Sequence, residues 1–497
     1  MLSASESRAQ PAPINVPLRP LDQSTLVVKA ADGTPIVANK NGSGIDGIKL
    51  SQHDTEIGSP SVAVAPDGTI HVAFVEQHRT TFARAIYYRG STDGGKTWTE
   101  AKNLSEEIPG PGIDVNRCQV MVDSRNRVYV IWRAALSARD AVSSNPVGDC
   151  RSNLLFRELE GGKWSKAKPV SEPCNDDTAN NAALSFFAAV DAAGRAHVVW
   201  NVGWPDKWHP ELTDEMHPGY RVHSLFIGNG LVFQSTLDGA TAGKPREVFL
   251  PVIIPIPNYG PSCDGLDALN GYVDAAGEAH FAAAVKRPHA DYAEPLHLGL
   301  IENGKAEHLL DLPTPVGSHT WQDIPTLLVD AKGQRHVIAL YLAGEHPNIR
   351  DYLLGSDDEP TVIRAAVGLN GIIDGFQAYQ GPGGRMVVIM QMNDTGERFA
   401  GDNFVSISTG DGKWSVPVNV TNNAGRKTFH NTETSAQSNV AVATSCLPGP
   451  GAVAFDRDGH LLLIMVKGEY TIVLATAFGV NTAGGDTITP TLRFLKF

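Results

Sequence analysis

One pattern recurs seven times along the chain: an apolar run, a tight turn on Asp or Gly, and a second apolar run. Each copy predicts a β-hairpin, because both runs either alternate between apolar and polar residues or are apolar throughout. The copies lie at residues 61–75, 119–132, 186–200, 270–285, 325–342, 376–391 and 451–466. The residue at the third position of the second run is here called the anchor. The anchors are His71, Tyr129, His197, His280, His336, Val387 and Leu462.

Hairpins that recur over nearly the whole chain predict a repeat architecture. Successive anchors lie between 51 residues apart (His336 to Val387) and 83 residues apart (His197 to His280), which is enough for a propeller blade. We therefore predict an all-β fold, a single seven-bladed β-propeller of four-stranded antiparallel blades, over residues 25–497. Residues 1–24 are expected to form a flexible N-terminal arm. A strand within residues 24–38 is expected to complete the last blade, since the ring otherwise ends in open edges.

Composition narrows the class of partner. Lys and Arg number 41 against 54 Asp and Glu, a formal net charge of −13, which disfavours binding to nucleic acid. An anionic sugar stays compatible with this charge, because a local arginine cluster can dominate a small site. No apolar run approaches the roughly 18 residues of a spanning helix, so no membrane span is expected. The polar, proline-rich N-terminus has no apolar signal core; either a signal was removed or the protein is intracellular.

A distinctive turn follows the third predicted strand of the first unit. Residues 91–98 read STDGGKTW, and weaker echoes occur at residues 161–164 (GGKW) and 408–414 (STGDGKW). We expect Asp93 to accept backbone N–H groups, the glycines to adopt positive φ, and Trp98 to pack between strands. The pattern Ser-x-Asp-x-Gly-x-x-Trp resembles the Asp-box of sialidase-like (BNR-repeat) propellers. It therefore indicates fold and assigns no catalytic role.

The resemblance also implies where a site would lie. With the strands of a blade lettered A to D from the axis outward, the A–B turns and Asp-boxes share one face. The D–A and B–C connections share the other face, around the mouth of the channel, and sialidase-like propellers carry their site there. Long loops in compact domains are usually functional or disordered. The longest insertions fall on this second face, at residues 134–149, 201–223, 257–267 and 426–448.

Polar and aromatic residues beside these connections are the site candidates. Aromatic rings stack on sugar rings, and arginine binds a carboxylate or sulfate through two parallel N–H groups. The candidate catalytic residues are His78, Arg117, Arg133, His289 and Tyr292. The candidate substrate-binding residues are Arg79, Trp204, Trp208, Asp264, Asp267, Arg287, Trp321, Asp323 and His346. The anchor histidines recur at one place inside a strand, and we expect them to have a packing role instead.

Two features separate the chain from true sialidases: it has seven units where those have six, and it lacks their Arg-Ile-Pro motif. It looks more similar to seven-bladed polysaccharide lyases and rhamnosidases that degrade ulvan and arabinogalactan. Those place one His before strand A and another just after strand B. His78 matches the second, whereas Ile57 and Gly58 stand where the first is expected.

This resemblance implies a carbohydrate-active enzyme that cleaves a glycosidic bond in an acidic, uronate-containing glycan, in the first instance a polysaccharide lyase acting by β-elimination. A lyase needs a cation to neutralise the uronate carboxylate and a base to remove a proton. Arg117 or Arg133 would be the cation, and His78, His289 or Tyr292 the base.

Two alternatives stay open. A sialidase-like or rhamnosidase-like exo-glycosidase would use two carboxyl groups, for which Asp264, Asp267, Asp323 and Glu345 are candidates. A non-catalytic glycan-binding propeller is the other. Lectins of this shape usually repeat their binding residues in every blade, whereas the mouth residues here differ between units, which favours one asymmetric site.

The five cysteines form no Cys-x-x-Cys pair, so a zinc ribbon is not indicated. Cys150 and Cys174 are predicted on neighbouring antiparallel strands, and a disulfide there would indicate an oxidising compartment. With the resemblance, this predicts a secreted or periplasmic protein. Cys118, Cys263 and Cys446 are expected to be buried as small apolar residues.

No cofactor and no metal ion are expected to be required for the reaction. A structural Ca²⁺ on carboxylates such as Asp176 and Asp177 is left open, although no EF-hand spacing supports it. The expected partner is an oligo- or polysaccharide, bound by a monomer.

Overall fold

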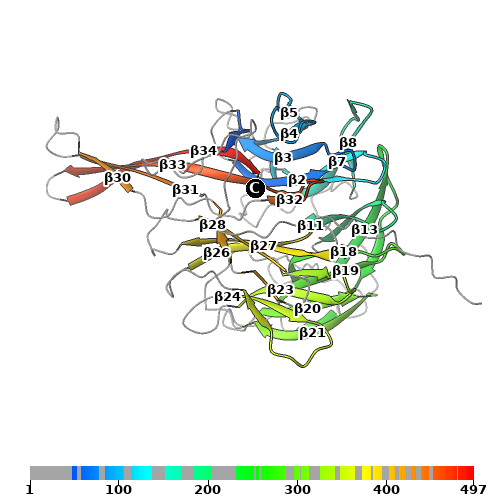
Figure 1. The fold of residues 1–497 in the computed structure, drawn as a ribbon. Coiled ribbons are helices and arrows are strands. Elements are labelled where there is room, and N and C mark those ends of the chain that lie inside the picture. The colour runs from blue at the N-terminus through cyan, green and yellow to red at the C-terminus, as the bar shows by residue number, and fades with distance from the viewer. Residues whose placement is uncertain are drawn as a thin grey trace, which may run out of the picture.

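The computed structural model describes residues 47–52, 57–77, 84–105, 113–136, 152–170, 183–202, 231–250, 253–256, 260–263, 265–286, 296–302, 304–312, 325–341, 348–363, 372–381, 384–393, 402–408, 413–415, 417–420, 427–431, 438–446, 452–477 and 480–496. Within these residues the secondary-structure elements are all β-strands, grouped into seven antiparallel blades (Figure 1). The all-β, seven-bladed prediction is confirmed. The predicted arm at residues 1–24 lies outside the described residues.

The first three blades follow the chain from the axis outward. Blade 1 contains β2 (Ile57–Val64), β3 (Ile70–Gln77), β4 (Arg84–Ser91) and β5 (Lys102–Asn103). Blade 2 contains β6 (Ile113–Val122), β7 (Val128–Leu136), β8 (Ser152–Glu160) and β10 (Lys168–Pro169), and β9 (Lys163–Trp164) also pairs with β8. Blade 3 contains β11 (Ala183–Val190), β12 (Ala196–Val202) and β13 (Leu231–Asp238), with β14 (Thr241–Ala242) and β15 (Arg246–Phe249) both paired to β13.

The next three blades repeat this order, after a short separate hairpin of β16 (Ile253–Ile256) and β17 (Gly260–Cys263). Blade 4 contains β18 (Gly265–Val273), β19 (Ala279–Lys286), β20 (Leu296–Glu302) and β21 (Lys305–Leu312). Blade 5 contains β22 (Thr326–Val329), β23 (Arg335–Tyr341), β24 (Asn348–Leu353) and β25 (Thr361–Ile363). Blade 6 contains β26 (Ile372–Gln380), β27 (Met386–Asn393), β28 (Asp402–Ile407) and β29 (Val418–Asn419).

Blade 7 joins the two ends of the described chain. It contains β32 (Ala452–Phe455), β33 (Leu461–Ala477), β34 (Val480–Lys496) and, on its outer side, β1 (Ile48–Lys49), which pairs with β34 at Phe494 and Arg493. The inner strands contact one another in the order β2, β6, β11, β18, β22, β26 and β32, and β32 contacts β2. The ring is therefore closed. Among the described residues, the two-residue β1 is the outer strand of this blade, and the strand expected within residues 24–38 lies outside the described residues.

The strands β33 and β34 run on past blade 7. Beyond Val466, β33 pairs with β34 on one side and with β31 (Ser438–Cys446) on the other, and β30 (Lys427–Asn431) forms the outer edge. This four-stranded extension leaves the ring on the left in Figure 1. It starts where strand B of blade 7 ends, which places it on the mouth face. The insertion predicted at residues 426–448 thus folds largely as a β-hairpin.

All seven predicted hairpins are the A and B strands of the seven blades, and every anchor is buried. The A–B turns of most blades are shaped by the same hydrogen bond. In blades 2 to 5 and 7 an Asp opens the turn and its Oδ1 accepts the backbone N–H four residues on, which defines a tight turn. Those Asp residues are Asp123, Asp191, Asp274, Asp330 and Asp456.

In blades 3 and 4 the same aspartate also binds the anchor histidine. His197 Nε2 lies 3.0 Å from Asp191 Oδ2, and His280 Nε2 lies 3.1 Å from Asp274 Oδ2. In blade 1 the anchor His71 is instead hydrogen-bonded to Tyr88, with Nδ1 2.7 Å from the tyrosine hydroxyl oxygen. The packing role expected for the anchor histidines is confirmed, since each is buried and hydrogen-bonded.

Three tryptophans after a third strand join neighbouring blades. Trp98 of blade 1 packs edge-on against Phe494 of blade 7, and Trp164 of blade 2 does the same against Tyr88 of blade 1. Trp414 of blade 6 donates a hydrogen bond to Asp351 of blade 5, 2.8 Å from Nε1 to Oδ2. Each indole thus binds its own blade to the preceding one. These are the tryptophans that the turn pattern singled out in the sequence.

The first of these turns is held as its residue types predict. Asp93 Oδ1 accepts the Thr97 N–H at 2.9 Å, and hydrogen bonds from the Thr97 side chain and backbone lower the pKa of Asp93 to about 2. Gly94 and Gly95 have φ values of +74° and +92°. A Cβ on Gly95 would lie 2.3 Å from Phe494 Cε1, so a side chain there would separate blades 7 and 1.

We predict that Gly95→Ala lowers the free energy of unfolding by more than about 2 kcal/mol, through backbone strain and displacement of Phe494. Gly161→Ala is the matched control: Gly161 also has positive φ (+55°), but an added Cβ would have no neighbour within 4 Å. It should cost about 1 kcal/mol from the backbone alone. Urea unfolding of the two variants measures the difference, and equal losses would show that Phe494 does not resist the side chain.

His71 gives the fold a pH dependence. Burial lowers its pKa to about 4, against a pKa of about 6.5 in an unfolded chain. Below pH ~6.5 the unfolded chain therefore binds a proton that the folded chain does not, so His71 destabilises the fold progressively down to pH ~4.

We predict that the wild-type protein loses about 3 kcal/mol through His71 between pH ~6.5 and pH ~4, and that His71→Gln removes this component. Urea unfolding at several pH values measures it. His336→Gln is the control of opposite sign, because Asp351 and Asp330 outweigh burial and raise the pKa of His336. Its stabilising effect is lost as the pH rises above ~6.5. An unchanged acid slope in His71→Gln would contradict the assignment.

Candidate functional site

Irregularities of the inner strands gather at the mouth face. In blades 1, 2, 3, 4 and 6 the A–B pairing skips a residue or two near the start of strand A, where the chain arrives from the D–A connection. Such β-bulges re-aim side chains and occur often beside active sites. The skipped residues include Ser59, Asn116, Ser185, Asp267 and Asp374. Polar residues thus stand in the bulges of five described inner strands.

Hydrogen bonds connect these bulges from blade 1 to blade 4. Cys118 Sγ lies 3.1 Å from the carbonyl oxygen of Ser59 in the preceding blade. Arg117 Nη1 donates to Ser185 Oγ of the following blade at 3.1 Å. The Ser185 N–H donates to Asn201 Oδ1 at 2.7 Å, and Asn201 Nδ2 donates to the carbonyl oxygen of Leu266 in blade 4 at 2.5 Å. One half of the mouth is therefore a continuous polar network.

Arg117 is the cation at the centre of this network. Its guanidinium lies 5.1 Å from the centre of the Phe186 ring, and its strand partner across the pair β6–β7 is Arg133. Burial, and then the charge of Arg133, lower the pKa of Arg117 to about 10, so it remains protonated at neutral pH. The other described groups that act on its charge are Cys118 and Tyr379, and none of the three is a carboxylate.

Tyr379 lies across the ring from Arg117 and near the A–B turn end of its strand, where it pairs with the anchor Val387. It lies on β26 of blade 6, donates a short hydrogen bond to Gln377, and interacts electrostatically with Arg117 of blade 2. Burial raises the pKa of the Tyr379 hydroxyl and of the Cys118 thiol. Both groups therefore stay uncharged at neutral pH and leave the positive charge of Arg117 uncompensated by them.

Of the predicted site residues, the structure brings Arg117 and Arg133 together as strand partners. Asp267 lies in the bulge of β18 at the same end of the ring. The end of β3, directly before the candidates His78 and Arg79, lies at this end too, because Glu76 pairs with Ile57 at the start of β2. The following predictions lie outside the described residues: His78, Arg79, Asp176, Asp177, Trp204, Trp208, Asp264, Arg287, His289, Tyr292, Trp321, Asp323, Glu345, His346 and the Cys150–Cys174 disulfide.

Ser185 and Tyr379 were not among the sequence candidates. Ser185 lies in an apolar run (ALSFFAAV) and Tyr379 in a strand without a charged neighbour, so neither carries a local signal. Asn201 carries one: it directly follows the buried apolar residues Val198, Val199 and Trp200, where an amide is out of place unless it is bonded. Cys118 is a free, buried thiol, as expected.

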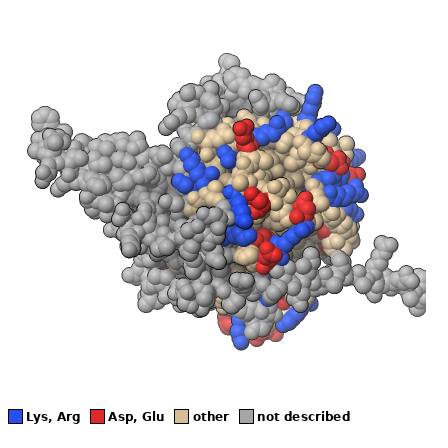
Figure 2. All heavy atoms as spheres, turned by 45° about the horizontal axis from the view of Figure 1, so that its top comes forward, with Lys and Arg blue, Asp and Glu red and all other residues tan. Residues whose placement is uncertain are grey.

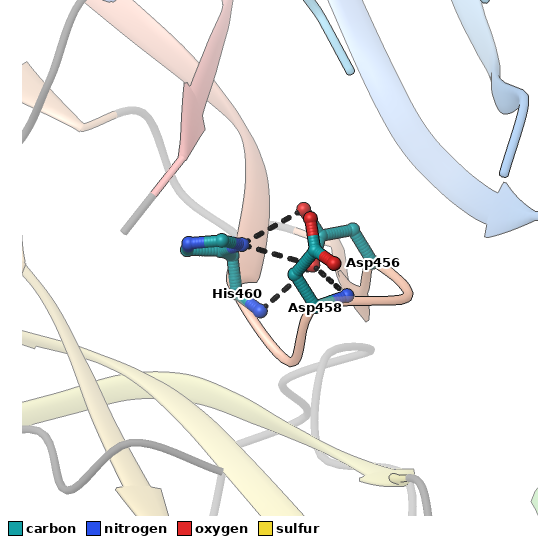
Figure 3. Close-up of side chains that lie close together, drawn as sticks. All are labelled: Asp456, Asp458 and His460. Atoms are coloured by element: carbon teal, nitrogen blue, oxygen red, sulfur yellow. Dashed lines mark hydrogen bonds and ion pairs between the residues drawn. The ribbon is translucent and has the colours of Figure 1, made fainter. Parts of the chain in front are cut away.

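One cluster on the opposite face has the residue types of a metal site. Asp456, Asp458 and His460 lie in the A–B turn of blade 7 (Figure 3). Asp456 Oδ1 accepts the backbone N–H groups of Asp458 and His460 at 2.9 and 2.8 Å, and its Oδ2 lies 2.6 Å from Lys496 Nζ. These bonds are those of a turn aspartate in the other blades, and they account for the cluster without an ion.

Charged side chains of both signs lie on the described surface (Figure 2). Figure 2 shows acidic and basic side chains intermixed over the described residues in view, with no field of a single sign. Among the described residues, no helix has the length and apolar character that crossing a membrane would require.

Comparison with known proteins adds only distant likenesses. No protein-family model matches the chain, and no curated protein matches it. An α-L-arabinanase of Penicillium chrysogenum in complex with arabinobiose shares 12% identity at a TM-score of 0.42, over 70% of this chain and 94% of that chain. A Hadza microbial sialidase shares 10% identity at a TM-score of 0.42, over 91% and 68%. Values of this size carry no information about substrate or reaction.

We expect Arg117 to lower the free energy of unfolding of the protein. It is a desolvated cation beside a second arginine, and replacing such a group by an apolar one of similar length is often neutral or stabilising. We predict that Arg117→Met leaves the free energy of unfolding unchanged or raises it by about 1 kcal/mol, because a thioether packs well on the Phe186 ring. Urea unfolding at neutral pH measures this. A loss above about 2 kcal/mol would mean that Arg117 is retained for stability.

Proposed function

We propose that the protein is a carbohydrate-active enzyme that binds an acidic glycan at the mouth face of the ring and cleaves a glycosidic bond there. The observation that carries this proposal is Arg117, a partly buried cation on the bulged inner strand of blade 2. The described groups that act on its charge include no carboxylate. A guanidinium in such surroundings gains from an anion, which these described groups do not supply.

The surroundings of Arg117 suit a sugar acid better than a large partner. Bonds among the Ser185 hydroxyl, the Asn201 amide and backbone groups connect the bulges of blades 3 and 4 to Arg117, so the guanidinium is held in place within a small area. Binding sites for small ligands combine a few such placed groups with apolar walls, here represented by Phe186. The differences between blades favour one site over a repeated set.

For the reaction we favour β-elimination. Arg117 would neutralise the uronate carboxylate, so that the proton on C5 becomes acidic. A base removes this proton, its electron pair forms the C4–C5 double bond, the C4–O bond breaks, and the leaving oxygen takes up a proton. The candidate bases are His78, His289 and Tyr292.

A hydrolase is the alternative, and the bulge position of Asp267 favours it, because hydrolysis requires carboxyl groups at the mouth. Secretion and a monomeric state remain predictions.

The test is turnover of a panel of uronate polysaccharides and of neutral arabinan. We expect new ultraviolet absorbance from an unsaturated uronate with the acidic substrates only. Arg117→Met should lower kcat/KM by about 100-fold or more, since it removes a charge needed in the transition state. Product mass spectrometry in ¹⁸O-labelled water separates the alternatives, because only hydrolysis incorporates the label.

The matched control is Arg195→Met. Arg195 also pairs with a protein group, Asp191, but it lies in an A–B turn on the opposite face. This variant should keep full activity. Cleavage of arabinan alone, or equal losses in both arginine variants, would overturn the acidic-glycan proposal. Saturable binding without any product would replace the enzyme by a glycan-binding propeller.

A further inference from the structure

We infer that Asn201 is a positioning residue that holds the backbone beside Arg117 and the backbone at Asp267 in one fixed geometry. The inference rests on the proposed function for the use of that geometry. Asn201 stands at the end of strand B in blade 3 and is fully buried. Its two amide atoms bond in two directions, to the bulge of its own blade and to the next blade.

Both bonds fall on backbone groups at bulges. Oδ1 accepts the N–H of Ser185, within the stretch that the pairing of β11 with β12 skips. Nδ2 donates to the carbonyl oxygen of Leu266, the residue before the bulged Asp267. A bulge leaves backbone groups without their ladder partner, and a buried one without any partner costs about 1–3 kcal/mol. Asn201 supplies partners at both places.

Each of the two Asn201 bonds affects the position of one candidate site residue, Arg117 or Asp267. Ser185 Oγ accepts the hydrogen bond of Arg117 at 3.1 Å, so a fixed Ser185 backbone fixes one partner of the guanidinium. Leu266 adjoins Asp267, so its held carbonyl sets where the backbone of that carboxylate-bearing residue lies. Asn201 therefore links blades 2, 3 and 4 through one side chain, and loosening it should move the two sides of the site independently.

The chemistry of the amide allows a sharp variant. The site needs one acceptor and one donor on the same short side chain, which Asn has and an ionised Asp lacks. A neutral Asp has both, a carbonyl oxygen and an O–H. Burial raises the pKa of a carboxyl group. Asn201→Asp should therefore behave as wild type when protonated at low pH and as Asn201→Ala when ionised at higher pH.

A matched control exists for a purely structural role. Gln234 is another buried amide that joins blades 3 and 4, but on the A–B turn face, where its Nε2 donates to the carbonyl oxygen of Gly277 at 2.9 Å. Gln234→Ala should lower stability as Asn201→Ala does. It should leave the mouth unchanged.

The first measurement needs no ligand. Amide hydrogen exchange, followed by mass spectrometry, should rise at least tenfold at residues 183–186 and 265–268 in Asn201→Ala and stay unchanged there in Gln234→Ala. In Asn201→Asp the exchange, corrected for its intrinsic pH dependence, should match wild type at about pH 5 and Asn201→Ala at about pH 8. The rate at which phenylglyoxal modifies Arg117 should rise severalfold in Asn201→Ala only.

The second measurement uses the acidic oligosaccharide that wild type cleaves. Asn201→Ala should lower kcat by about tenfold with less than a twofold change in KM, and its effect should be absent in an Arg117→Met background, since coupled residues are not additive. If wild type cleaves no member of the panel, the proposed function fails while exchange and modification still decide the positioning role. Unchanged exchange and Arg117 reactivity in Asn201→Ala, or equal changes in Gln234→Ala, would overturn the inference.

Discussion

Face-to-face packing of neighbouring blades around the axis is the constraint on which the rest of the structure depends. Each described core cluster draws its apolar residues from two neighbouring sheets, as when Phe156 of blade 2 and Phe186 of blade 3 share one cluster. A single blade could not bury both of its faces, so the blades are stable only as a ring. The ring in turn needs a last contact between its ends, and the two-residue strand β1 on β34 provides it.

The A–B turn face of the ring is regular, and the mouth face is irregular. On the A–B turn face one device repeats: an aspartate closes the turn, and in blades 3 and 4 it also binds a buried histidine. On the mouth face the inner strands are bulged, and their bonds differ from blade to blade. Repetition is what a structural face requires, because every blade meets the same packing problem. A site for one ligand requires departures from it, and these collect where Arg117 lies.

The sequence predicts the fold far better than the site, for physical reasons. A hairpin is a local event, so alternation and turn residues were enough to locate all seven A–B pairs. The pairing of β1 with β34 has no local signal, because β1 is two residues long and its partner lies at the other end of the chain. The sequence pattern does not reveal the bulges either. Skipping Asp267 or Asn116 shifts the strand pairing by one residue without changing the residue types around it. The pairing of Arg117 with Arg133 follows from the hairpin, whereas the bond from Asn201 to Leu266 joins residues 65 positions apart.

The arrangement of the bonded bulges also decides where a single asymmetric site can form. The network runs from Ser59 through Cys118 and Arg117 to Ser185, Asn201 and Leu266, so it spans blades 1 to 4. Blade 6 lies across the ring from this arc, and its Tyr379 interacts with Arg117 from near the A–B turn end of β26. Arg117 is a partly buried cation beside Arg133, an arrangement that works against stability, and none of the described groups that act on its charge is a carboxylate.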